Sequence, residues 1–164
     1  IVVRFIIAIR FKKFSVKREL QMLLVYICLV VIARFVYFPL HFINGKIGTL
    51  TIGFSKTPFN MISLIPFYFL FDRYDGWLIN IFGNIAMFIP VGIVWPICFR
   101  KLDNIKKTVF AGICFIIFIE LSQLLCPTRH TDIDDIILNT SGVMIGACVI
   151  FAIRKAANTD ISRQ

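Results

Sequence analysis

Four stretches of the chain are long and apolar enough to cross a membrane. They cover approximately residues 20–38, 77–99, 108–126 and 133–153. At a rise of 1.5 Å per residue, a helix of about 20 residues matches a hydrocarbon core about 30 Å thick. The pattern therefore predicts an all-α membrane protein with four transmembrane helices.

Basic residues predict how these helices are oriented. They gather before the first stretch, between the second and third, and after the fourth, as Arg4, Arg10, Lys12, Lys13, Lys17, Arg18, Arg100, Lys101, Lys106, Lys107, Arg154, Lys155 and Arg163. Lysine and arginine concentrate in the cytoplasmic loops of membrane proteins. We therefore expect both termini to be cytoplasmic, in a multi-pass protein of the cell membrane.

The chain divides into one membrane domain and two flanks. Residues 1–18 mix apolar and basic side chains and form a cytoplasmic or interfacial segment. Residues 19–155 form the single membrane domain, and 156–164 a cytoplasmic tail. Between the first two helices, residues 39–76 form a long loop that is too apolar for water, so we expect it to lie in the interface or to be re-entrant.

The composition excludes an ordinary soluble domain. Hydrophobic residues make up 59% and charged residues 16% of the chain, and the mean hydropathy is +0.85. The formal net charge of +9 follows from the basic flanks, so it indicates membrane topology better than nucleic-acid binding. The five cysteines lack metal-binding spacing, which favours a packing role.

Polar side chains interrupt the apolar stretches at a common depth. Glu120 and Gln123 lie near the outer end of the third stretch, Asn139 near that of the fourth, and Asn80 and Asn84 near that of the second. Arg34 stands one turn from the outer end of the first. An ionisable residue inside a membrane segment indicates a functional site, because its insertion costs about 2.5–3.5 kcal/mol. We therefore predict a polar pocket that opens to the outer leaflet.

A single helical stripe supports this pocket. Asp135, Asn139, Gly142 and Gly146 stand at i, i+4, i+7 and i+11 of the fourth stretch. The two glycines predict close packing of another helix.

Several of these residues also have structural interpretations. Asp132 is expected to cap the fourth helix together with Thr131 and Asp134. Asn80 and Asn84 fit interhelical hydrogen bonds, and Arg34 fits a side chain that reaches the outer headgroups. A buried ion pair with Arg34 or Arg129 would account for Glu120, and His130 is expected to be exposed.

The chemistry of the pocket stays open at this point. Glu120 and Asp135 are the candidates for a general acid and base. Asn80, Asn84, Gln123, Arg129, Asp132 and Asn139 are the candidate ligand-binding residues, with Arg129 facing an anionic group. A divalent cation among Glu120, His130, Asp132 and Asp135 is an alternative, but no established metal spacing is present. We predict no metal and no cofactor, and no catalytic motif decides whether the protein is an enzyme.

The ordered polar positions resemble those of the VanZ-like family of small bacterial membrane proteins. The similarity covers about residues 60–150 and rests on the segment 84–92 (Asn-Ile-Ala-Met-Phe-Ile-Pro-Val-Gly), and on Glu120, Gln123, Arg129, Asp132, Asp135, Asn139, Gly142 and Gly146. Residues 64–67 (Leu-Ile-Pro-Phe) resemble a further element of the family, although Ser63 replaces the asparagine expected before it.

The resemblance implies a bacterial cell-envelope protein of the Gram-positive type, in a family whose namesake is associated with low-level teicoplanin resistance. It implies no settled reaction. Our leading hypothesis is that the pocket binds, or acts on, an anionic headgroup of a membrane lipid, a lipid-linked cell-wall precursor or a lipoglycopeptide. The alternatives are a proton-coupled lipid transporter that works as an oligomer, and a scaffold whose stripe Asn139–Gly146 packs on another membrane protein.

Overall fold

Three helices of the protein are long and apolar enough to cross a membrane. The computed structural model describes residues 15–38, 42–43, 46–47, 53, 62–68, 76–126 and 131–161. Its helices are α2 (Val16–Tyr37), α3 (Trp77–Cys98), α4 (Ile105–Gln123) and α5 (Ile133–Ile161). The three apolar ones are α2, α3 and α5. The prediction of an all-helical membrane protein is therefore confirmed.

The fourth helix differs from the predicted transmembrane helix. α4 packs beside α3 and α5, but it is not apolar enough to count as a span. Lys106, Lys107 and Glu120 all fall within its 19 residues, which explains the difference. The ends of the other helices lie close to the predicted ones, except that α5 continues to Ile161 and includes most of the predicted tail.

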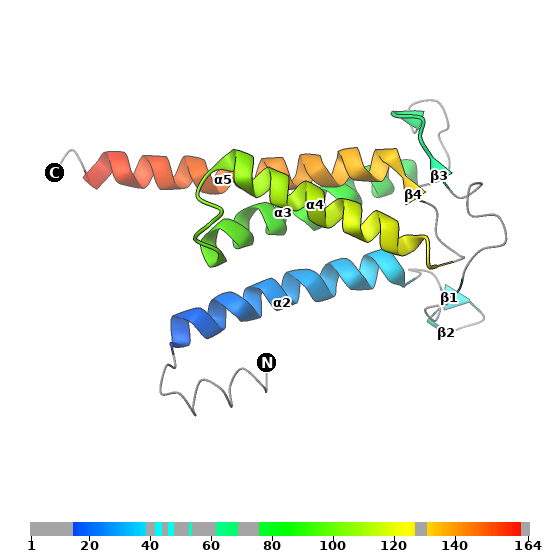
Figure 1. Cartoon of the computed structure of the whole chain (residues 1–164), viewed down its shortest axis with the longest axis horizontal. Helices are drawn as coiled ribbons and strands as arrows, with labels where there is room; N and C mark the ends of the chain where they lie inside the picture. Colours follow the sequence, from blue (N-terminus) through cyan, green and yellow to red (C-terminus); the bar gives the residue numbers. More distant parts are fainter. Residues whose placement is uncertain are drawn as a thin grey trace.

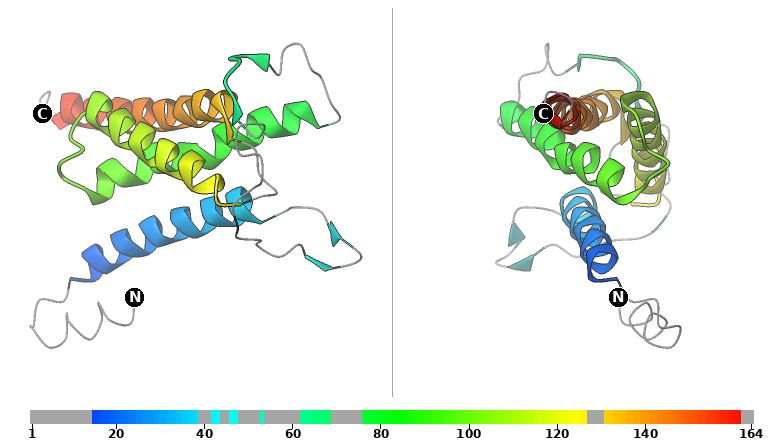
Figure 2. Two further views of the ribbon diagram at one scale, coloured as in Figure 1. Left: turned by 45° about the vertical axis from the view of Figure 1, so that its right-hand side comes forward. Right: turned by 90° about the vertical axis from the view of Figure 1, so that its left-hand side faces the viewer.

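The helices form a bundle in which α2 is the outlying member. α3, α4 and α5 lie side by side, while α2 diverges from them toward its N-terminal end (Figure 1). The end-on view places α2 on one side of the other three (Figure 2). α3 packs most extensively on α5, and α2 packs on α3. The buried core is formed by Ile32, Val36, Phe88, Val91, Ile116, Ile119 and Val143.

Glycines allow α3 and α5 to approach closely. A Cβ atom on Gly142 would overlap the carbonyl oxygen of Ile85, and one on Gly146 would overlap that of Ile89. From the other side, Gly92 of α3 faces the backbone of α5 in the same way. The stripe of small residues is therefore filled by α3 of the same chain, which removes the surface that the scaffold hypothesis required.

Short strands gather at one end of the bundle (Figure 1). β1 (Phe42–Ile43) pairs with β2 (Lys46–Ile47) in an antiparallel arrangement. β3 (Ile62–Ser63) pairs in parallel with β4 (Thr131–Asp132), which directly precedes α5. Most of the predicted long loop, and residues 1–14, lie outside the described residues.

Two arginines and a glutamine hold the other end of the bundle together. Arg154 of α5 donates a hydrogen bond to the Pro96 carbonyl (2.9 Å), and Arg18 of α2 donates one to the Cys98 carbonyl (2.5 Å). Gln21 of α2 donates a third to the Ile97 carbonyl (3.0 Å). The last carbonyls of a helix lack partners within the helix and carry partial negative charge. These arginines therefore stabilise the C-terminal end of α3.

Candidate functional site

Glu120 is the buried charged residue around which the site is built. Its side chain on α4 is only 3% exposed. The groups that act on its carboxyl group are the backbone of Asp132 and the carboxylates of Asp135 and Asp132. Its Oε2 atom has no hydrogen-bond partner within the described part of the chain. Glu120 thus lies where α4 meets the start of α5, at the same end of the bundle as the strands.

Two further buried side chains present oxygen atoms without partners. Gln123, one turn beyond Glu120 on α4, is 7% exposed, and Asn139, one turn after Asp135 on α5, is 3% exposed. Neither the Oε1 atom of Gln123 nor the Oδ1 atom of Asn139 receives a hydrogen bond from the described residues. Most buried polar atoms in proteins are hydrogen-bonded, so such atoms call for an explanation.

α3 contributes an amide to the same region. The Nδ2 atom of Asn84 donates to Asp135 Oδ1 at 2.6 Å and to Asn80 Oδ1 at 3.1 Å. Asn84 therefore connects α3 to the carboxylate on α5, while Asn80 lies one turn further out and is exposed. We refer to Asn84, Glu120, Gln123, Asp135 and Asn139 as the Glu120 cluster. It draws residues from three helices, at the common depth that the sequence predicts.

The start of α5 is held by side-chain hydrogen bonds. Asp132 Oδ1 accepts from the backbone N–H of Asp134 (3.0 Å), which is the N-cap geometry that the sequence predicts. The Thr131 hydroxyl instead donates to the backbone carbonyl of Glu120 (3.1 Å). It therefore ties β4 to α4 next to the Glu120 cluster.

Asp134 connects α5 to the segment 62–68. Its Oδ1 atom accepts a hydrogen bond from the backbone N–H of Phe67 at 2.6 Å. Phe67 has a φ of 62°, a left-handed conformation that is uncommon for a non-glycine residue. Together with the pairing of β3 and β4, this bond holds the Leu-Ile-Pro-Phe segment against the end of the bundle that contains the Glu120 cluster.

Replacing Asp134 with alanine is expected to loosen this segment. The Phe67 N–H would lose its acceptor, while α5 would keep the cap supplied by Asp132. Hydrogen–deuterium exchange of the purified protein in detergent should show faster exchange in residues 62–68 and little change in the middle of α5. Asp134→Asn retains the acceptor oxygen and serves as the control. Equal exchange in wild type and Asp134→Ala would contradict the proposed role of the bond.

Arg34 does not form the ion pair with Glu120 that was one of the expectations. Arg34 donates to the Phe38 carbonyl at the end of its own helix (3.3 Å) and lies over the Phe38 ring. It therefore caps α2, and the described residues contain no ion pair between it and Glu120. Arg129 and His130 lie outside the described residues, so the alternative pairing of Glu120 with Arg129 stays a prediction.

One polar contact at this end was not predicted from the sequence. The hydroxyl groups of Tyr37 and Ser122 form a short hydrogen bond between α2 and α4. Ser122 stands between Glu120 and Gln123 in the sequence, and Tyr37 ends the first apolar stretch, so both lie at the predicted depth of the pocket. That shared depth was the available signal.

No metal centre is apparent in this part of the structure. Among the described residues, no group of three or more His, Cys, Asp or Glu side chains is placed to hold a metal ion. The Glu120 cluster offers hydrogen-bond acceptors: the carboxylates of Glu120 and Asp135, and the amide oxygens of Gln123 and Asn139 that have no partner among the described residues. Such a set favours a ligand that donates hydrogen bonds.

The fold and the site define a class of protein: a multi-pass helical membrane protein with a buried carboxylate cluster near one end of the bundle. The sequence profile of the VanZ/LLP1 family matches residues 23–154, and the chain belongs to this family. No curated protein and no solved structure matches the chain.

Proposed function

We propose that this VanZ-family protein binds the headgroup of a lipid-linked cell-envelope molecule at the Glu120 cluster. The observation that carries the proposal is Glu120 itself, a carboxyl group that is almost fully buried and has one oxygen without a partner. Leaving a buried acceptor unsatisfied costs about 1–3 kcal/mol. A bound ligand that donates to Glu120 would recover that free energy.

The acceptors of the cluster favour a particular kind of headgroup. Glu120 Oε2, Gln123 Oε1 and Asn139 Oδ1 can each accept a hydroxyl, amide or ammonium hydrogen. Sugars and peptides carry such donors, and both occur in lipid-linked cell-wall precursors and in lipoglycopeptides. Arg129, which lies outside the described residues, is our candidate for the anionic part of the same headgroup, because its planar fork matches phosphate or carboxylate.

Access from the outer leaflet is part of the proposal. We infer that α4 crosses the membrane as a fourth span despite its charged residues, and that both termini are cytoplasmic. The basic residues that cap α3, Arg18 and Arg154, lie at the end opposite to the Glu120 cluster, which agrees with the positive-inside rule. The cluster would then open toward the outer leaflet of the bacterial cell membrane.

A catalytic form of the proposal uses the same residues. Glu120 and Asp135 interact electrostatically, and two neighbouring carboxyl groups can divide the roles of general acid and base. In the binding form, Glu120 and Asp135 only bind the headgroup. Binding of the headgroup then lowers the susceptibility of the cell to teicoplanin. The two forms differ in whether a reaction product is released.

Replacing Glu120 with glutamine tests the proposal. We would reconstitute the full chain in lipid nanodiscs and measure binding of a polyprenyl-diphosphate-linked disaccharide-pentapeptide, with the polyprenyl diphosphate alone as the second probe. Wild type should prefer the probe that carries the sugar and peptide, and Glu120→Gln should weaken that preference by about tenfold, since a hydrogen bond to a charged group contributes about 1.5–3 kcal/mol.

The matched control is Glu19→Gln, which removes a carboxylate from the first turn of α2, at the other end of the bundle. It should bind both probes like wild type. If Glu120→Gln binds the headgroup probe as tightly as wild type does, the cluster is not its binding site. Analysis of the recovered probe by mass spectrometry separates the two forms, because only the catalytic form yields an altered headgroup.

A further inference from the structure

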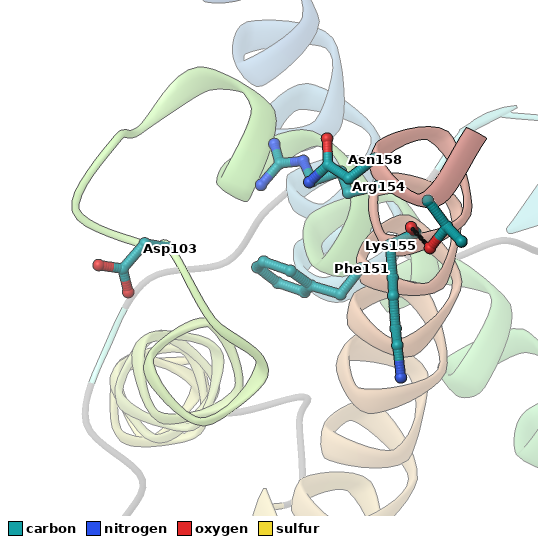
Figure 3. A pocket seen from close by; sticks show the side chains of 6 residues that line it. Asp103, Phe151, Arg154, Lys155 and Asn158 are labelled. Carbon is teal, nitrogen blue, oxygen red and sulfur yellow. Dashed lines mark hydrogen bonds between the residues drawn. The ribbon is translucent and has the colours of Figure 1, made fainter. Parts of the chain in front are cut away.

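A second polar site lies at the end of the bundle that is opposite to the Glu120 cluster. It is an open pocket of about 460 Å³, lined by Asp103, Phe151, Arg154, Lys155, Asn158 and Thr159. The side chains of Phe151 and Arg154 extend from α5 toward the loop between α3 and α4, whereas the Asp103 carboxylate points away from them (Figure 3). Nothing in the proposed function uses this pocket.

Arg154 is held in a fixed position at this pocket. It donates one hydrogen bond to the Pro96 carbonyl (2.9 Å), and its guanidinium group lies 5.2 Å from the centre of the Phe151 ring. A guanidinium group has five N–H donors in a rigid fork. The remaining donors are thus available to an acceptor in the pocket, and little conformational freedom is lost when one binds.

The pocket has a positive charge balance. Lys155 also lines the pocket, with its ammonium group pointing away from Arg154 (Figure 3), and Asn158 adds an exposed amide. The one acid, Asp103, forms an ion pair with Lys107 (2.8 Å), and the Lys107 ammonium group holds the pKa of its carboxyl group below the usual range. Asp103 is therefore ionised and already paired, which leaves the charge of Arg154 and Lys155 uncompensated by it. A guanidinium group with free donors beside an amide, and a flexible lysine on the same turn of α5, suit a phosphate group.

The position of the pocket relative to the membrane indicates that a lipid supplies that phosphate. Residues 136–153 of α5 contain no charged side chain and extend for about 27 Å, close to the thickness of a hydrocarbon core. Arg154 is the first charged residue after them and therefore lies at headgroup level. In the two turns that precede it, Val149 and Ile153 are 45% and 58% exposed, so they are available to acyl chains.

We propose that this pocket binds the phosphodiester headgroup of an anionic phospholipid in the leaflet that faces the basic end of the bundle. Arg154 contacts the phosphate oxygens, Asn158 donates to the headgroup, and the flexible Lys155 side chain turns toward the same headgroup when the lipid binds. The site is independent of the Glu120 cluster and does not require that cluster to bind anything.

Lipid binding by charge-matched variants tests this proposal. The full chain in detergent would be titrated with phosphatidylglycerol against phosphatidylcholine, and bound lipid would be measured by native mass spectrometry. Wild type should retain phosphatidylglycerol preferentially. Lys155→Gln should lower this affinity about fivefold, because a basic residue near anionic lipid contributes about 1 kcal/mol. Asn158→Asp, which adds a negative charge to the pocket, should lower it further.

Lys106→Gln is the matched control. It removes the same charge from the same end of the protein, but Lys106 is exposed on α4 and does not line the pocket. This variant should bind phosphatidylglycerol almost as wild type does. Equal losses in Lys155→Gln and Lys106→Gln would show a diffuse basic surface and overturn the proposal. Binding of soluble glycerol 3-phosphate with the affinity of the lipid would overturn the assignment to a phospholipid.

Discussion

Replacing Gly142 with alanine is expected to destabilise the bundle by about 1–3 kcal/mol, the usual cost of overpacking a filled core. A Cβ atom at this position would overlap the Ile85 carbonyl oxygen of α3. A backbone carbonyl cannot rotate away as the tip of a side chain can, so α3 and α5 would have to separate. Gly146→Ala should have a similar effect, because its Cβ atom would overlap the Ile89 carbonyl.

This expectation can be measured by unfolding the protein with sodium dodecyl sulfate in mixed micelles. Trp95 lies on α3 beside the core, so its fluorescence reports the separation of α3 from its neighbours. Gly83→Ala is the matched control, because Gly83 lies on α3, the helix against which Gly142 of α5 packs, and a Cβ atom there would meet nothing within 4 Å. If Gly142→Ala and Gly83→Ala unfold at the same detergent fraction, the close contact between α3 and α5 is wrong.

Replacing Glu120 with glutamine is expected to make the protein more stable, by about 1–3 kcal/mol, while it weakens binding of the headgroup probe. The cost of burying a carboxylate with one unpartnered oxygen disappears. The new amide keeps an acceptor oxygen and adds N–H donors in a region where Gln123 and Asn139 present oxygens without partners among the described residues. Opposite changes in stability and binding are typical of a functional site, since function there is kept at a cost in stability.

Adding a carboxylate next to Glu120 is expected to have the opposite effect on stability. Gln123→Glu would add a second carboxylate one turn from Glu120, and we expect it to unfold at a lower detergent fraction than wild type. Both variants would be measured in the same unfolding experiment without added ligand. A loss of stability in Glu120→Gln would show instead that Glu120 forms a structural interaction, such as the ion pair with Arg129 that the sequence also allows.

The helices were predicted well because their signal is local. A run of about 20 apolar residues is sufficient to identify a membrane span, and the structure places α3 and α5 at Trp77 and Ile133, where the predicted stretches begin. α4 was harder to classify, because its lysines and Glu120 lie within an otherwise apolar helix. The N-cap at Asp132 was also predictable, since it depends on residues only two positions apart.

The partners of the polar side chains were less predictable. The sequence placed Asn84 and Glu120 at one depth and put Asp135 on the stripe of the fourth stretch, and the structure joins Asn84 to Asp135. It did not predict that Asp134 would bind the backbone of Phe67 or that Arg34 would turn to its own helix end. These contacts depend on how each helix is rotated and on where a loop is placed.

The sequence by itself determined the class of the protein, the approximate positions of its helices and the depth of its polar residues, because hydropathy and the rise per residue fix all three. The tertiary structure decided which faces meet. In a membrane, lipid tails are as apolar as leucine, so burial does not select one face of an apolar helix. The close approach allowed by Gly92, Gly142 and Gly146, together with hydrogen bonds between distant residues, made that selection.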